Sequence, residues 1–227
     1  MEEWLLATDK VCQVLGLPRL PDPTTLQRTY QKLRKLDFEK MKNRILEEEN
    51  IQEEGIASDS SGFSPGQASL YYQTRSGRTY EHWIQGAYAV GTESQSILSW
   101  QSGYAPSNDV AHLKPLKRSC ARFGTHSETK QRTWLMLAEA GFDAKKLSSL
   151  DIIPPLRRHA KLLHPERKAR ADLVSAARLD GRFGQPWKTQ TVNSVIKRKF
   201  GDTIPSRKIQ LHRRQPIIKA LVYNMHP

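Results

Sequence analysis

Apolar residues in the first quarter of the chain recur at helical spacing. They predict one helix over residues 3–15, ended by Gly16, and a longer helix that begins after Thr24 or Thr25. The three prolines of residues 17–23 predict a rigid connector between these helices, because proline cannot continue a helix. The apolar stripe of the longer helix consists of Leu26, Tyr30, Leu33, Leu36, Met41 and Ile45.

From Gly55 onward the pattern changes to short strands interleaved with helices. The predicted strands cover residues 56–58, 80–90, 96–100, 133–138 and 152–153, and the predicted helices cover residues 108–122, 187–200 and 216–225. Residues 156–185 are polar, basic and weakly periodic, which predicts a loop with helical turns. The alternation indicates an α/β fold with a mixed sheet. We therefore expect an N-terminal helical segment over residues 1–54 and an α/β domain over residues 55–227.

Positive charge is concentrated in the second half of the chain. The 227 residues carry 36 Lys and Arg against 23 Asp and Glu, a net charge of +13. Residues 111–227 hold 25 of the basic and 8 of the acidic side chains, so this stretch alone carries +17. Such an excess is typical of proteins that bind a polyanion, most often a nucleic acid. An anionic membrane surface is the competing partner, but no basic helix has the large apolar face that it requires.

Other features of the sequence argue against membrane insertion and export. The longest apolar runs, such as residues 134–138, stop at five residues, far below the roughly 18 that span a bilayer. The N-terminus is acidic where a secretion signal is basic, so we expect a cytoplasmic protein. Cys12 and Cys120 lack metal-ligand spacing and are expected to be reduced thiols.

Asp59, Glu139 and Gln190 stand out by their positions in the predicted domain. Asp59 ends its first strand, Glu139 follows strand 133–138, and Gln190 lies in the first turns of the helix from Trp187. Ligand sites collect at strand ends in α/β sheets, and carboxylates that converge from two strands and a helix hold one or two Mg²⁺ ions for phosphodiester chemistry. An Asp at a strand end is also a common turn former, so position alone leaves both interpretations open.

The motifs around these residues resemble those of bacterial insertion-sequence DDE transposases. The matching segments follow the family's order and spacing over nearly the whole chain: Leu17–Leu26, Asp59–Ser64, Ala68–Tyr72, Arg75–Gly77, Ala89–Val90, Ala138–Asp143, Thr191–Gly201 and Leu221–Met225. The resemblance implies a ribonuclease H-like fold, with a mixed sheet flanked by helices. It also implies Mg²⁺-dependent chemistry, in which activated water cuts one DNA strand and the freed 3′-hydroxyl attacks target DNA.

The chain departs from the family at the residues that the resemblance marks as catalytic. The family's first Asp corresponds to Asp59, its second Asp to Glu139 and its Glu to Gln190, so Asp59 and Glu139 are the metal ligands that remain. The family's C-terminal Tyr, Arg, Glu and Lys correspond to Phe183, Pro186, Gln190 and Lys197.

These changes point to an impaired site. Glu139 is one methylene too long, and a misplacement of about 1 Å can cost roughly 100-fold in rate. The amide of Gln190 removes a full negative charge from a site meant for divalent cations. We therefore expect weakened Mg²⁺ binding, with Asp143 as the candidate substitute carboxylate.

Basic residues near the motifs are the candidate DNA contacts: Arg75, Arg78, Lys197, Arg198, Lys199, Arg213 and Arg214. Lys197 lies seven residues after Gln190, so a helix places both on one face, two turns apart. Each cation alone is also compatible with a solvated surface, but the charge of +17 favours nucleic acid for the set. The expected partner is double-stranded DNA, at transposon ends and target sites, with no membrane. Family members commonly act as dimers, so a homodimer associated with the bacterial nucleoid is also expected.

Two functional hypotheses remain. The first is a DDE transposase with impaired activity through Asp59 and Glu139. The second is a non-catalytic DNA-binding protein, a decayed or domesticated remnant that occupies transposon ends. The altered ligands favour the second, whereas the order of the motifs assigns ancestry to the first. A helical protein-interaction module is a distant third.

Overall fold

The computed structural model describes residues 12–13, 16–65, 83–104, 108–144, 147–156, 165–206 and 209–225. By internal contacts the chain divides into two compact units, Met1–Asp37 and Phe38–Pro227. This division differs from the boundary expected after residue 54. The helix predicted over residues 3–15 lies outside the described residues, apart from Cys12 and Gln13.

Helix α2 (Pro23–Lys32) begins two or three residues earlier than the predicted cap at Thr24 or Thr25. Asp22 is its N-cap and accepts a hydrogen bond from the Thr25 backbone N–H at 3.0 Å. The single long helix predicted here is wrong, because the backbone leaves the helical region at Leu33. A new helix, α3 (Lys35–Glu48), then begins, and the Arg34 backbone N–H donates to Asp37 Oδ2 at 2.6 Å, one half of a capping box.

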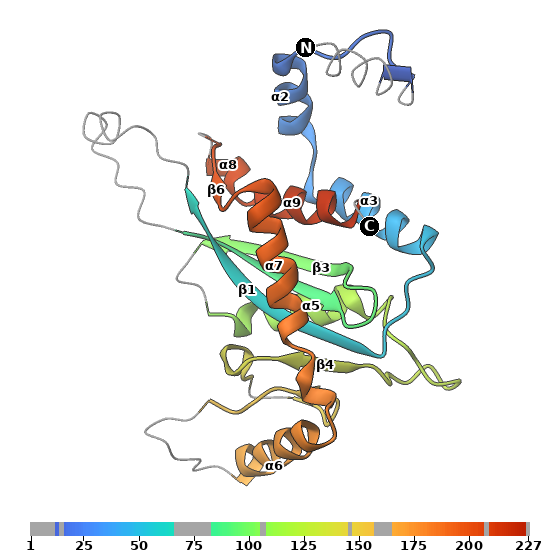
Figure 1. The fold of residues 1–227 in the computed structure, drawn as a ribbon, viewed down its shortest axis with the longest axis vertical. Helices are drawn as coiled ribbons and strands as arrows, with labels where there is room; N and C mark the ends of the chain where they lie inside the picture. The colour runs from blue at the N-terminus through green and yellow to red at the C-terminus, as the bar shows by residue number, and fades with distance from the viewer. Residues whose placement is uncertain are drawn as a thin grey trace, which may run out of the picture. The chain divides into compact units, whose positions relative to one another are not determined.

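The second unit is built on a mixed sheet with the strand order β3-β2-β1-β4-β5 (Figure 1). Its strands are β1 (Gly55–Pro65), β2 (Ile84–Gly91), β3 (Ile97–Tyr104), β4 (Leu135–Ala138) and β5 (Asp151–Ile152). Strand β2 runs antiparallel to β1 and β3, whereas β4 and β5 run parallel to β1. A short strand, β6 (Thr203–Ile204), pairs with the far end of β1. The predicted α/β class with a mixed sheet is therefore confirmed.

Helices cover both faces of this sheet. On one face α5 (Val110–Cys120) contributes Leu113 and Leu116 to a core that includes Ile56 of β1. On the other face the next β1 residue, Ala57, packs with Val174 and Ala177 of α6 (Pro165–Leu179). In front of β1 runs α7 (Trp187–Phe200), with α9 (Arg214–Asn224) beyond it (Figure 1). The remaining short helices are η1 (Ala140–Phe142), η2 (Arg182–Gly184) and α8 (Ile209–His212).

A buried lysine ties α3 to the sheet. Lys42 is fully buried, and its ammonium donates to the Leu98 carbonyl at 2.7 Å and to Ser119 Oγ at 3.2 Å. The part of α3 from Phe38 onward therefore belongs with the sheet.

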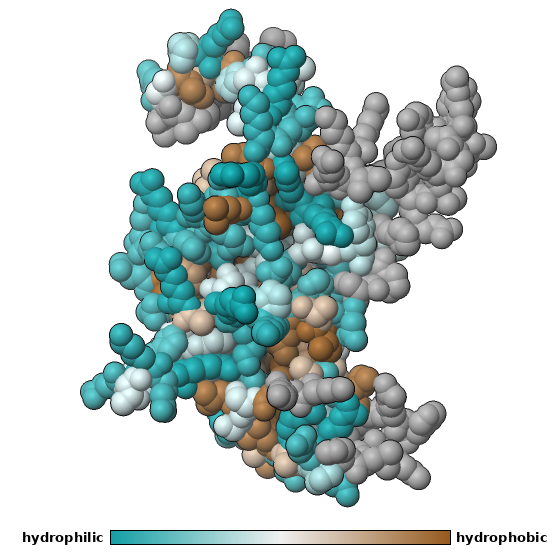
Figure 2. Space-filling model, turned by 180° about the vertical axis from the view of Figure 1, so that it is seen from behind, coloured by the Kyte–Doolittle hydropathy of each residue, from teal (hydrophilic) through white to brown (hydrophobic). Residues whose placement is uncertain are grey.

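Seen from behind, the molecule has a mainly hydrophilic surface with limited hydrophobic patches (Figure 2).

Two sequence predictions in this unit are wrong. Strand β1 continues to Pro65 instead of ending after Ser58, because Asp59 to Phe63 pair residue by residue with β2. Residues 165–179 form the regular helix α6, although their charge hides the periodicity. Its apolar side is narrow, with Val174 and Ala177 as its buried residues. The helices predicted from 108, 187 and 216 are observed as α5, α7 and α9.

Candidate active site

Two acidic side chains leave neighbouring strands at the same level of the sheet. The parallel pairing of β1 with β4 ends at Ser58 and Ala138. Asp59 is the next residue of β1, and Glu139 is the next residue after β4. Asp59 therefore lies within β1, not at its end, but at the point where the partner strand stops. The structure brings Asp59 and Glu139 together by this register.

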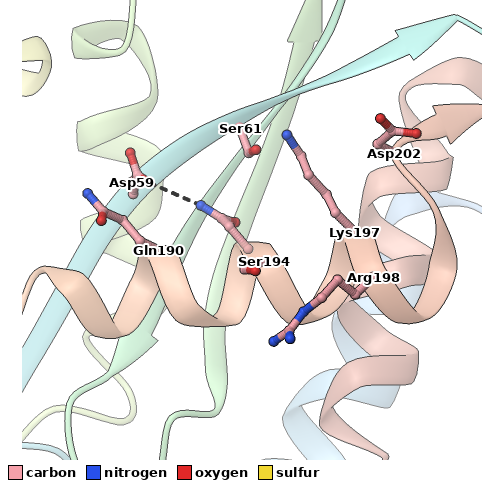
Figure 3. Close-up of a pocket in the computed structure, with 8 residues that line it drawn as sticks. Asp59, Ser61, Gln190, Ser194, Lys197, Arg198 and Asp202 are labelled. Carbon is pink, nitrogen blue, oxygen red and sulfur yellow. Dashed lines mark hydrogen bonds between the residues drawn. The ribbon is translucent and has the colours of Figure 1, made fainter.

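Helix α7 supplies two carboxamides that bind these carboxylates. Gln190 Nε2 donates to Glu139 Oε1 at 2.9 Å. Asn193 Nδ2 donates to Asp59 Oδ2 at 3.1 Å, the dashed line in Figure 3. Gln190 and Asn193 are three residues apart, so they lie on one face of the helix. We call Asp59, Glu139, Gln190 and Asn193 the carboxylate–amide cluster. Sequence reasoning missed Asn193, although its spacing from Gln190 was the available signal.

The electrostatic environment of Asp59 raises the pKa of its carboxyl group. Burial raises the pKa of Asp59, and the nearby carboxylates of Glu139 and Asp109 raise it further. Hydrogen bonds from the Ser60 backbone N–H and the Asn193 amide act in the opposite direction without cancelling the effect. Asp59 therefore lies close to two other carboxylates. A cation or an amide N–H donor at this site would stabilise its ionised form.

Donor chemistry decides whether the cluster fits Mg²⁺. A buried Asn193 Oδ1 without a hydrogen-bond partner among the described residues would suit a cation. The two amides, however, present N–H donors to both carboxylates, and Mg²⁺ needs oxygen ligands in near-octahedral geometry. Within the described ranges, no group of three or more Asp, Glu, His or Cys side chains is arranged to hold a metal. The residues therefore do not fit a catalytic Mg²⁺.

Asp143 does not supply the missing carboxylate. Its Oδ1 accepts from Arg170 Nη1 at 2.5 Å, and its Oδ2 accepts from the Leu156 backbone N–H at 2.9 Å. Arg167 adds an ion pair at 3.3 Å. Both oxygens of Asp143 are therefore occupied by contacts that attach α6 and the Leu156 backbone. These contacts do not support Asp143 as a substitute metal ligand.

Asp109, at the start of α5, is the additional carboxylate that affects Asp59, and sequence reasoning missed it. It accepts hydrogen bonds from Ser60 Oγ at 2.5 Å and from Gln85 Nε2. Ser60 follows Asp59 in β1 and therefore points to the opposite face of the sheet. Asp109 thus acts on Asp59 from the α5 side, while the Asn193 amide acts from the α7 side.

A pocket of about 430 Å³ extends from Asp59 along α7 (Figure 3). From α7 it is lined by residues that repeat at helical spacing, with Ser61 opposite them on β1 and Asp202 at the far end. The α7 residues are Gln190, Asn193, Ser194, Lys197 and Arg198. Lys197 shares a face with Gln190 two turns later, as predicted.

Lysine side chains gather at the far end of the pocket, beside the carboxylate of Asp202. Lys197 reaches toward β1 (Figure 3). Its ammonium lies 5.7 Å from the centre of the Phe63 ring. Lys219 of α9 lies 5.2 Å from the same ring and donates to the carbonyls of Gly201 and Thr203. Burial lowers the pKa of Lys219. Sequence reasoning missed this lysine, which interrupts the apolar pattern of the last helix.

The other predicted DNA contacts lie elsewhere. Lys199 is exposed on the last turn of α7 but does not line the pocket. The guanidinium of Arg213 packs over the Tyr104 ring at 4.6 Å, near the end of β3, and Arg214 begins α9. Arg75 and Arg78 lie outside the described residues.

Phe183 and Pro186 precede α7 and contribute no charged group. Phe183 packs against the core cluster of Ala57 and Leu137, and the Arg178 guanidinium lies 5.0 Å from its ring centre. Pro186 is the residue before the first turn of α7, where its missing N–H is not needed. Phe183 therefore keeps a packing role, and Pro186 keeps a place at the start of α7.

No protein-family model, curated protein or solved structure matches this chain. In the described part of the chain, no helix is long and apolar enough to cross a membrane. Cys12 and Cys120, both described, form no disulfide.

Proposed function

We propose that the chain is a DNA-binding homologue of insertion-sequence DDE transposases whose nuclease site is impaired. The observation that carries the proposal is the convergence of Asp59, Glu139 and Gln190 at one level of the sheet. These three residues are the ones that the family resemblance marks as catalytic, and they come from β1, the end of β4 and α7. The strand order β3-β2-β1-β4-β5, with β2 antiparallel to β1, supports the ribonuclease H-like assignment.

Impairment follows from the amide at position 190. A carboxylate there would add a third negative ligand, whereas Gln190 instead donates a hydrogen bond to Glu139. Each carboxylate of the cluster has its own amide partner, so the cluster is stabilised without a divalent cation. This arrangement favours a binding protein over an enzyme with residual activity through Asp59 and Glu139.

DNA binding is supported by charge at two scales. Residues 111–227 carry +17, and Lys197 and Arg198 place two of these cations at the pocket beside Asp59. Cations in the last turn of a helix also stabilise its dipole, which gives Lys197, Arg198 and Lys199 a structural role as well. The dipole does not account for an excess spread over 117 residues (227 − 110).

Binding in the absence of metal tests this proposal. The full chain is titrated with a labelled DNA duplex in EDTA at several salt concentrations. We expect binding that weakens steeply with salt, with a slope of about −0.9 for each phosphate contacted. An affinity that is independent of salt, or binding that requires Mg²⁺, would contradict the proposal.

A further inference from the structure

Trp187 is an exposed aromatic side chain at the start of α7. It is 54% exposed, whereas Trp100 and Trp134 are buried in the core. Burying a large aromatic side chain is favourable, and this exposed indole lies one turn before Gln190 on α7, although it does not itself line the pocket. Trp83 is 56% exposed but stands over Gly62, whose β1 position faces away from Asp59.

The outward face of α7 connects Trp187 to the pocket. At 100° per residue, Ser194 and Arg198 fall within about 20° of Trp187 around the helix axis, and Gln190 lies one turn beyond it. The opposite face, with Thr189, Val192 and Ile196, is buried against the sheet, and Gln190 and Asn193 lie on the side between these two faces. Trp187 therefore begins a row that passes the carboxylate–amide cluster and ends at Lys197 and Arg198, about 15 Å away at 1.5 Å per residue.

We propose that this row binds an unpaired stretch of nucleic acid, with a base stacked on Trp187 and phosphates at Lys197 and Arg198. An aromatic platform followed by cations is the arrangement with which proteins hold single strands, because every base offers a π-face and every linkage a negative charge. Bases inside a duplex are already stacked and cannot use the indole. The inference rests on the proposed DNA-binding function and adds that this site takes the strand in unpaired form.

The spacing suits such a strand. The row spans a length that a few nucleotides of an extended chain would cover, and its middle residues, Gln190 and Ser194, are exposed and uncharged. The cations of the row are confined to one end, where Asp202 also lines the pocket, so the base platform and the phosphate contacts are separated along the strand. A docked protein segment would be the alternative occupant, but it would not require the cations.

Tryptophan fluorescence and affinity test this inference on the full chain. The probes are an oligothymidylate of about 12 nucleotides, within the usual site size for single strands, and a duplex of equal length. We expect the single strand to quench the fluorescence of wild type and Trp83→Phe, but to quench Trp187→Phe much less. Trp187→Ala should weaken single-strand binding by about 5- to 150-fold, the range expected for one stacked base.

Matched variants separate the outcomes. Trp83→Ala should leave single-strand affinity within about twofold, and Trp187→Phe should retain most of the affinity that Trp187→Leu loses, because phenylalanine can still stack. If Trp187→Ala binds the single strand as tightly as wild type does, or loses as much affinity for the duplex as for the single strand, the inference is overturned. The proposed DNA-binding function would still stand in either case, provided that wild type binds the duplex. Failure of wild type to bind either DNA would overturn both.

Discussion

Gln190 changes both the charge and the hydrogen bonding of the site. Its amide donates to Glu139, which lies close enough to Asp59 to raise the pKa of that carboxyl group. A glutamate at 190 would remove the donor and place a third negative charge beside the other two. The single oxygen-to-nitrogen change therefore removes one negative charge from the site and gives Glu139 a hydrogen-bond donor.

Gln190→Glu should make the fold respond to divalent metal. In EDTA the variant should unfold at a lower temperature than wild type, because like charges then face one another. Mg²⁺ or Mn²⁺ at about 100 times the dissociation constant adds about 2.7 kcal/mol, or roughly 5–10 °C for a chain of this size. Thermal unfolding with and without metal measures this, and Gln131→Glu, at an exposed position, is the control. An equal metal shift in wild type would contradict the interpretation of the amides.

Asp59→Asn should stabilise the protein at pH 7. Burial and the neighbouring carboxylates raise the pKa of Asp59 in the folded state, so the folded state binds its proton more tightly than the unfolded state does. Ionised Asp59 therefore costs stability, and the cost grows as pH rises above the ordinary Asp value of 3.8. Denaturant unfolding at pH 7 and pH 4 should show a gain that shrinks at the lower pH. Loss of stability at pH 7 would contradict this.

Asp151→Asn should have the opposite sign. Burial opposes ionisation of Asp151, but hydrogen bonds from Lys117, Ser148 and Arg132 lower its pKa overall. Its charge therefore stabilises the fold above the ordinary Asp range, and this contribution disappears as pH falls. Breaking a buried ion pair costs about 3–5 kcal/mol, and the partial exposure of Lys117 and Arg132 places the expected loss at or below the lower end. The same unfolding experiment measures it, and an unchanged stability at pH 7 would contradict the assigned role.

At the scale of elements, the sequence pattern predicted the helices and strands that bury an apolar side. It missed the element boundaries that are set by local hydrogen bonds and strand pairing. Strand β4 and helices α5, α7 and α9 follow from apolar spacing. The Asp37 side chain caps the start of α3 and so supports the break between α2 and α3. The apolar stripe runs through both helices, so the sequence pattern does not reveal this break. The length of β1 depends on its pairing with β2, because its own residues are small and polar.

The site shows the same division. Asp59, Glu139 and Gln190 were found because they fall at predicted element ends and within recognisable motifs. Asn193 and Asp109 were missed because their importance comes from the packing of α7 and α5 on opposite faces of β1. Asp143 was suggested because it is near Glu139 in sequence, but η1 turns the chain so that Asp143 contacts α6 instead.

Asp143→Asn should loosen α6 without affecting the cluster. It weakens a partner of Arg170, of Arg167 and of the Leu156 backbone, so we expect a loss of about 1–3 kcal/mol. Hydrogen exchange should then rise in α6 more than in α7. Asp180→Asn is the control, because Asp180 pairs with Arg182 at an exposed position. Faster exchange confined to α7 would contradict this assignment.

At the scale of the whole molecule, the pocket cations should contribute to duplex binding beyond their share of the net charge. Lys197→Ala and Arg198→Ala should each weaken binding and make the salt slope less steep by about 0.9, as expected for one lost phosphate contact. Lys199→Ala removes the same charge from the same turn but outside the pocket, so its effect should be smaller. Titrations at several salt concentrations measure the slopes, and equal slopes for all three variants would show that only net charge matters.

Strand nicking of supercoiled DNA tests the central claim most directly. Wild type, Asp59→Ala and the double variant Glu139→Asp with Gln190→Glu are compared in Mg²⁺ and in Mn²⁺. The expected result is that wild type nicks no faster than Asp59→Ala, although it binds the DNA. The double variant should recover partial activity, limited by Phe183 and Pro186, where the family has a phenol and a guanidinium. Robust nicking by wild type that disappears in Asp59→Ala would contradict the claim, because it would show that the amide-containing site is an active variant.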